Sequence, residues 1–137
     1  MTPKLMLDTN ICIYLMKNQL PDVEERFQDF FVGEIVISAI TLAELEFGVS
    51  LKGKEFEKRN RLALSSLLED ILVAPFDHQA ARSYGPLRAI YKDRTRDALD
   101  KLIASHAASL GVILVTNNEN DFMNFPGLKV ENWVKKI

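Results

Sequence analysis

Apolar and polar positions divide the chain into short, almost wholly apolar runs and longer stretches in which apolar residues recur every three or four positions. The short runs predict β-strands, and they lie at 4–7, 34–39, 71–77, 112–118 and 128–133. The longer stretches predict helices, and they lie at 10–18, 21–31, 40–51, 55–71, 78–92 and 98–110. Strands that alternate with helices are typical of a parallel α/β sheet. The pattern therefore predicts one α/β domain over residues 1–137, with a mostly parallel sheet of about four to five strands flanked by helices.

Three local features refine this picture. Gly85-Pro86 should bend or break the helix at 78–92, because proline removes a backbone donor and clashes with the preceding turn. In the helix at 98–110 one apolar stripe should face the core, which makes His106 a packed side chain and neither a ligand nor a base. Its members are Leu99, Leu102, Ile103, His106 and Leu110. Cys12 lies in an apolar context and is best explained as a small core residue.

Composition limits the classes of protein that remain. The chain is 47% hydrophobic, which suffices for a core, and no apolar run approaches the ~20 residues that span a bilayer. No export segment precedes the domain, so we expect a cytoplasmic protein. The net charge of -2 argues mildly against nucleic-acid binding. However, two segments are locally basic and could guide a nucleic-acid backbone through Lys52, Lys54, Arg94 and Arg96.

Four acidic residues stand at the ends of predicted elements. They are Asp8, Glu44, Asp100 and Asp121. Each has a structural explanation when taken alone. Asp8 could cap the next helix, and Glu44 could close a capping box with Thr41. Asp100 could favour a first helical turn capped by Asp97, and Asp121 fits ordinary loop composition.

Taken together, these acids suggest a site. Carboxyl ends of parallel strands share one edge of the sheet, so the four carboxylates could converge there. The four carboxylates would repel one another, and each would raise the pKa of the others, unless a cation were present. Oxygen ligands without usable Cys or His favour Mg²⁺, with Mn²⁺ possible, over zinc. A site of this kind suits phosphodiester hydrolysis, whereas no glycine-rich phosphate loop supports nucleoside triphosphate turnover.

An ordered set of short segments resembles a PIN domain, and more narrowly the VapC-type toxins of bacterial toxin–antitoxin pairs. The segments are MLDTN, SAITLAEL, YGPLRA, LDKLIASHAASLG and LVTNN…DF, and the closing GLKVENW is similar to one VapC subgroup. The resemblance covers essentially the whole chain. It implies a Mg²⁺-dependent endoribonuclease, a cognate VapB-type antitoxin and a homodimer. The subgroup further implies a structured RNA substrate, with the anticodon stem-loop of initiator tRNA the best single choice.

The resemblance also assigns roles to individual residues. Asp8 and Asp100 would ligate the metal, and Glu44 and Asp121 would complete the catalytic pocket. Thr9 and Asn118 fall where the family has supporting polar side chains, and they would hold a carboxylate or a phosphate oxygen. Asp97 is an additional acid in a segment, KDRTRDALD, where related toxins often carry a glycine-containing turn, and its role stays open.

Two other functions are compatible with the same residues. The fold could be a non-catalytic regulatory module held by a partner, with structural acids. Alternatively, a PIN nuclease of the same chemistry could act on DNA or in ribosomal RNA processing.

Overall fold

A computed structural model describes residues 2–90, 98–122 and 125–134. These residues form one sheet of five strands in the order β3-β2-β1-β4-β5, and every neighbouring pair is parallel. The strands are β1 (Leu5–Leu7), β2 (Ile35–Ser38), β3 (Leu72–Ala74), β4 (Ile113–Val115) and β5 (Lys129–Glu131). The predicted α/β class and parallel sheet are confirmed, although each strand is shorter than its apolar run.

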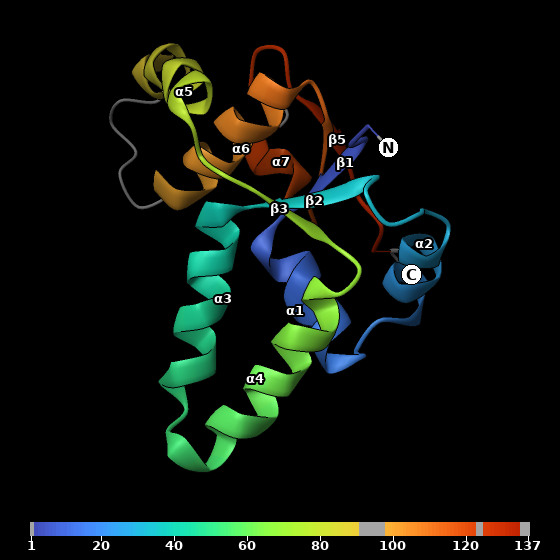
Figure 1. Cartoon of the computed structure of the whole chain (residues 1–137). Helices are drawn as coiled ribbons and strands as arrows, with labels where there is room; N and C mark the ends of the chain where they lie inside the picture. Colours follow the sequence, from blue (N-terminus) through green and yellow to red (C-terminus); the bar gives the residue numbers. More distant parts are fainter. Residues whose placement is uncertain (1, 91–97, 123–124, 135–137) are drawn as a thin grey trace.

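Helices cover both faces of this sheet (Figure 1). They are α1 (Thr9–Lys17), α2 (Pro21–Gln28), α3 (Ala39–Leu51), α4 (Lys54–Leu68), α5 (His78–Ile90), α6 (Ala98–Leu110) and the short α7 (Glu119–Phe122). Helices α1, α3 and α4 lie on one side of the sheet, and α5 and α6 lie on the other. Among the described residues, no helix combines the length and apolar character needed to cross a membrane.

The central strands are apolar on both faces because each face packs against helices. Leu5 and Leu7 of β1 point into the core beneath α1, α3 and α4, while Met6 between them points into the core beneath α6. Cys12 is fully buried in the first of these cores, as predicted, and burial raises the pKa of its thiol. One core packs against each face of the sheet, and together they fix the position of its carboxyl edge.

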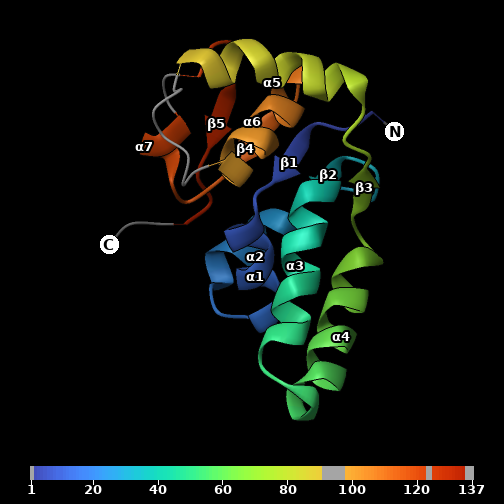
Figure 2. The same ribbon diagram turned by 90° about the vertical axis from the view of Figure 1, so that its left-hand side faces the viewer.

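Helices α3 and α4 form a hairpin that extends well beyond the sheet (Figure 2). Gly53 connects them with a φ of 89°, a value that side-chain-bearing residues rarely adopt. Leu64 and Leu67 of α4 are buried, but Leu62 is 63% exposed. The hairpin therefore offers an extended surface beside α1.

Two expectations about helices need correction. Helix α5 continues through Pro86, with the Gly85-Pro86 pair on its exposed side, so the predicted break does not occur, while a bend at this point stays a prediction. In α6, Leu99 and Leu110 are exposed, whereas Lys101, Ser105 and Ala107 are buried beside His106. Three of the six buried residues of α6 are small, Ala104, Ser105 and Ala107, which lets α5 pack closely against it.

Candidate active site at the carboxyl edge of the sheet

Asp8 lies where β1 ends and α1 begins. Its backbone N–H donates to the carbonyl of Val115 at 3.0 Å, which ties this point to the end of β4. Its carboxylate caps α1 by accepting the N–H of Ile11 at 3.0 Å, so the capping explanation is correct. The same carboxylate also accepts a hydrogen bond from the Thr116 side chain. The cap therefore coexists with a buried carboxylate at the rim of the sheet.

The environment of Asp8 disfavours its charged form. The side chain is 7% exposed, and burial is the largest cause of its raised pKa. The nearby Glu44 carboxylate raises the pKa of Asp8 further by charge repulsion. Hydrogen bonds from Thr116 and from the backbone only partly offset these effects. A cation placed between the two carboxylates would remove both penalties.

Glu44 is held by a residue of another element. Thr9 at the start of α1 donates its hydroxyl to Glu44 Oε1 at 2.6 Å, which joins α1 to α3 beside Asp8. The capping-box alternative is wrong, because Ser38 caps α3 by accepting the N–H of Ile40 at 3.0 Å. Glu44 lies in the second turn of α3 and is half-buried.

The other two acids come from the elements on either side of β4. Asp100 lies in the first turn of α6 and is half-buried. Asp121 lies in α7 and is exposed, and its backbone N–H donates to the carbonyl of Asn118. Asn118 is itself exposed, and its N–H donates to Thr116 Oγ1 at 3.0 Å.

Several candidate residues lie outside the described part of the chain. Asp97, Arg94 and Arg96 belong to the segment 91–97. Of the basic candidates that are described, Lys52 and Lys54 are exposed at the far end of the α3–α4 hairpin.

The described residues pair Asp8 with Glu44 but contain no group of three or more Asp, Glu, His or Cys side chains arranged to hold a metal ion. The donor chemistry nevertheless fits a hard divalent cation. The four candidate acids offer carboxylate oxygens, and the buried Asp8 is destabilised by a like charge that a cation would neutralise. PIN nucleases in general depend on divalent metal ions.

Thr116 is the residue of this site to which sequence reasoning gave no role. It is fully buried and bonds the Asp8 side chain. Only the parallel register, in which Leu7 pairs with Val115, brings it there. A polar residue directly after a wholly apolar strand was the available signal.

His106 is packed in the interior, as predicted. It is 1% exposed, its Nδ1 lies 2.8 Å from Ser38 Oγ, and Phe76 contacts its ring edge-on. Burial lowers the pKa of His106, although Asp77 opposes that effect. The ring is thus a neutral part of the packing between α6 and the start of α3.

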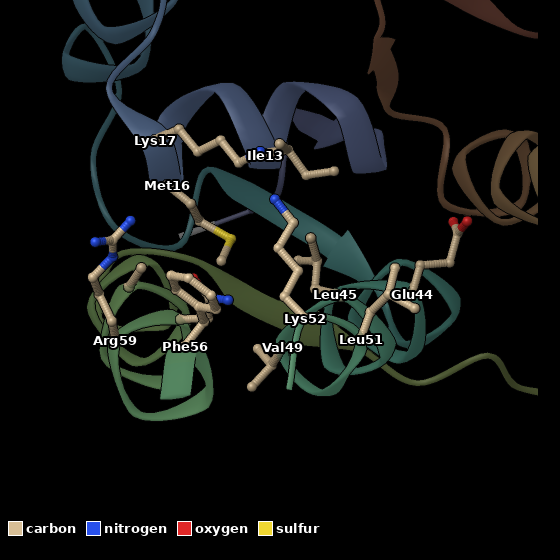
Figure 3. A pocket seen from close by; sticks show the side chains of 13 residues that line it. Ile13, Met16, Lys17, Glu44, Leu45, Val49, Leu51, Lys52, Phe56 and Arg59 are labelled. Atoms are coloured by element: carbon tan, nitrogen blue, oxygen red, sulfur yellow. The ribbon is translucent and has the colours of Figure 1, made fainter. Parts of the chain in front are cut away.

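A groove of about 760 Å³ opens next to Glu44, between α1, α3 and α4 (Figure 3). Its apolar lining comes chiefly from Ile13 and Met16 of α1 and from Leu45 and Val49 of α3. Figure 3 shows Glu44 at one end of the groove, with Lys17, Lys52 and Arg59 around the remainder. The groove is therefore acidic at the rim of the sheet and basic along its length.

Comparison with known proteins identifies the family. Residues 5–128 match the PIN domain. The tRNA(fMet)-specific endonuclease VapC of Shigella flexneri is 39% identical over 132 residues, which cover 95% of this chain and 98% of that protein. The protein of the same name from Salmonella typhimurium is 36% identical over the same shares of the two chains.

Solved structures agree with this assignment. DNA-bound VapBC from Salmonella typhimurium matches with a TM-score of 0.85 and 36% identity, covering 96% of this chain and 99% of that one. VapBC2 from Rickettsia felis, bound to a promoter DNA fragment, matches with a TM-score of 0.82 and 33% identity, covering 94% and 98%. The chain belongs to the PIN-domain family and, within it, to the VapC-type endoribonuclease toxins.

Proposed function

We propose that this chain is a Mg²⁺-dependent endoribonuclease toxin that cuts the anticodon stem-loop of initiator tRNA and so inhibits translation in the cytoplasm. The observation that carries the metal-dependent chemistry is the buried Asp8 carboxylate, destabilised by the adjacent Glu44 and therefore suited to a divalent cation. Mn²⁺ would serve with the same oxygen ligands. The named substrate of the two enterobacterial relatives, tRNA(fMet), supports the choice of RNA.

Each residue of the site has a distinct task in this proposal. Asp8 and Asp100 would hold the ion, which would supply positive charge to the scissile phosphate and favour ionisation of the attacking water. Glu44, fixed by Thr9, and Asp121 would orient that water in line with the leaving oxygen. Asn118 would bond a phosphate oxygen. Attack of the water with the O3′ oxygen as the leaving group produces 5′-phosphate and 3′-hydroxyl ends.

The decisive experiment is brief expression of the wild-type chain followed by sequencing of newly formed RNA ends. We expect one dominant set of ends in the anticodon loop of initiator tRNA. Ends in ribosomal RNA or in DNA would favour the alternative PIN nuclease. If no new ends appear while a partner protein still binds, the chain is the regulatory module.

We further propose that a VapB-type antitoxin occupies the groove beside Glu44. The solved relatives are VapBC complexes, which supports such a partner. Charge suggests the form of the bound segment. An Arg or Lys would pair with Asp8 and Glu44, and apolar side chains followed by acidic ones would match Ile13, Met16 and the basic end. A homodimer that encloses a shared RNA groove is the accompanying expectation.

Substitution in the groove tests the antitoxin. Met16→Asp should abolish inhibition by the protein encoded beside this one, because it puts a charge in the apolar lining, and should leave RNA cleavage intact. The matched control is Leu62→Asp, since Leu62 is 63% exposed on α4 and does not line the groove. A neighbouring gene product that neither binds nor inhibits would contradict the toxin–antitoxin pairing and leave the nuclease chemistry standing.

A further inference from the structure

Four polar side chains from separate elements form a row beside the acidic rim. Asn132 Nδ2 lies 3.3 Å from Glu119 Oε1 and also 3.3 Å from Asn117 Oδ1. Asn117 Nδ2 in turn lies 3.5 Å from the Tyr14 hydroxyl. We call these residues, Tyr14, Asn117, Glu119 and Asn132, the amide–tyrosine row. All four residues are half-buried.

The amide–tyrosine row continues the line of the site across the sheet. Strand order places β2, β1, β4 and β5 side by side, as Figure 2 shows. Asp8 follows β1, Asn117 follows β4 by two residues, and Asn132 follows β5 directly. Adjacent strands lie ~4.8 Å apart, so the row begins about one strand from Asp8, on the side opposite Glu44. An RNA strand that crosses this edge from β2 towards β5 would pass Glu44 and Asp8 before it reaches Asn117 and Asn132.

A backbone contact fixes the direction in which the amides face. The N–H of Val134 donates to Asn132 Oδ1 at 2.9 Å, which turns Asn132 Nδ2 towards Asn117 and Glu119. Asn117 therefore accepts through Oδ1 and turns its own NH₂ group towards Tyr14. The contact at 3.5 Å is at the long limit of a hydrogen bond, so a ligand can replace it with little loss.

We propose that the amide–tyrosine row reads one unpaired base next to the scissile phosphate, an inference that rests on the RNA-cleaving function proposed above. Asn117 offers an amide N–H and Tyr14 a hydroxyl hydrogen, so the pair suits a base edge with adjacent acceptors, such as O6 and N7 of guanine. The Tyr14 ring packs partly against the core and is half-buried, so a base would stack on the part that stays exposed, and bases in RNA loops are unstacked enough to do so. Asp8 and Asp100 would hold the metal ion that acts on the phosphate, while the Asn117 amide and the Tyr14 hydroxyl would contact the base.

The probe is a library of RNA hairpins whose loop positions are all randomised, incubated with protein and Mg²⁺, with the cut ends sequenced. We expect the wild-type protein to enrich one base at one fixed position beside the cut. Asn117→Ala should reduce that enrichment about tenfold and leave the other loop positions unchanged, because it removes one of the two proposed hydrogen bonds to the base. Tyr14→Phe keeps the ring and removes only the hydroxyl, so it should weaken the same preference while folding normally. Tyr84→Phe, which alters a half-buried tyrosine of α5, is the matched control.

The outcomes distinguish failure of the base-reading inference from failure of the RNA-cleaving function on which it rests. A wild-type protein that cuts no member of the library overturns the ribonuclease proposal and this inference together. If the wild type cuts but Asn117→Ala and Tyr14→Phe keep its base preference, only the base-reading inference is overturned. Lower thermal stability with an unchanged preference has the same meaning, because the row would then merely brace the segment after β5 against α1.

Discussion

Two buried polar clusters lie near the start of α3, and they differ in electrostatic cost. At the rim, Asp8 is buried next to another carboxylate, and its pKa is raised by both effects. In the interior, His106 meets Ser38 at 2.8 Å and Phe76 edge-on, and its pKa is lowered so that the ring stays neutral. The interior cluster is an ordinary solution to burying a polar group, since each partner is neutral and bonded.

Asp8 at the rim, unlike the interior cluster, is buried without a partner that fully offsets the cost of its charge. Thr9, Thr116 and the backbone of α1 organise the carboxylates but do not neutralise them. A protein keeps such an arrangement when it is used for binding or chemistry, because local rules are broken mainly at functional sites. The contrast therefore supports the proposal that the rim carries out catalysis and that the interior cluster contributes stability. Each prediction below tests that division.

The largest expected effect is on cleavage by Asp8→Asn. Asn caps a helix as well as Asp does, so the fold should persist while a metal-binding charge is lost. We expect cleavage of a tRNA stem-loop to fall by about three orders of magnitude. Asp100→Asn should act in the same way.

Glu46→Gln is the matched control for these variants. Glu46 lies on α3 near Glu44 but is paired with Arg61 at 2.6 Å and faces away from the rim. It should cut at the wild-type rate. Asp8→Asn protein that cuts as fast as the wild type would show that the rim is not the catalytic centre.

His106→Ala should affect stability and spare activity. Removing a ring that is 1% exposed leaves a cavity and removes one of the two hydrogen-bond partners of the Ser38 hydroxyl, which should lower the free energy of unfolding by about 3 kcal/mol. Denaturant titration measures that loss, and cleavage per folded molecule should stay near normal. His78→Ala, at an exposed position, should change neither quantity. A well-folded but inactive His106→Ala protein would show that this histidine takes part in catalysis.

Much of this contrast could be predicted from sequence. Asp8 and Glu44 were found because each follows a buried apolar run, and parallel strands must end at one edge. His106 was placed in the core by helical periodicity. These inferences depend on patterns within single elements, which a sequence states directly.

The errors come from contacts between elements. Helix α5 continues through Pro86 because packing against α6 outweighs the lost backbone hydrogen bond. Leu99 and Leu110 are exposed because close contact with α5 buries small residues such as Ala104 and Ala107 instead. Thr116 and the amide–tyrosine row depend on the β1–β4 and β4–β5 registers, which no local pattern encodes.

Addition of Mg²⁺ should produce a smaller but diagnostic effect. An ion that binds the folded rim stabilises the protein by about 2.7 kcal/mol at a concentration 100-fold above its Kd, seen as a rise in Tm. Asp8→Asn should lose this rise, and His106→Ala should keep it from its lower starting Tm. A wild-type Tm that is indifferent to Mg²⁺ would favour the non-catalytic binding module.

The smallest effects are opposite responses to pH, measured with a metal chelator present. The pKa of Asp8 is raised above its ordinary 3.8, so its stabilising contribution is complete below that pH and is lost as pH rises through the raised value. Wild-type protein should therefore lose stability relative to Asp8→Asn as pH rises from about 4 through the acidic range. Subtracting the free energies of unfolding of the two proteins cancels pH effects that they share, such as the one from Glu34, whose pKa is lowered.

His106 should respond in the other direction. Its pKa is lowered below 6.5, so the unfolded chain binds more protons in this window, and stability falls as pH drops from about 6.5 towards the lowered value. Against His106→Gln, which can still bond Ser38, the wild type should lose stability on acidification, by about 1.4 kcal/mol for a pKa difference of one. Asp77, whose carboxylate favours the charged ring, should reduce this loss, so Asp77→Asn should enlarge it. If both stability differences changed in the same direction with pH, the predicted electrostatic contrast between the rim and the interior would be wrong.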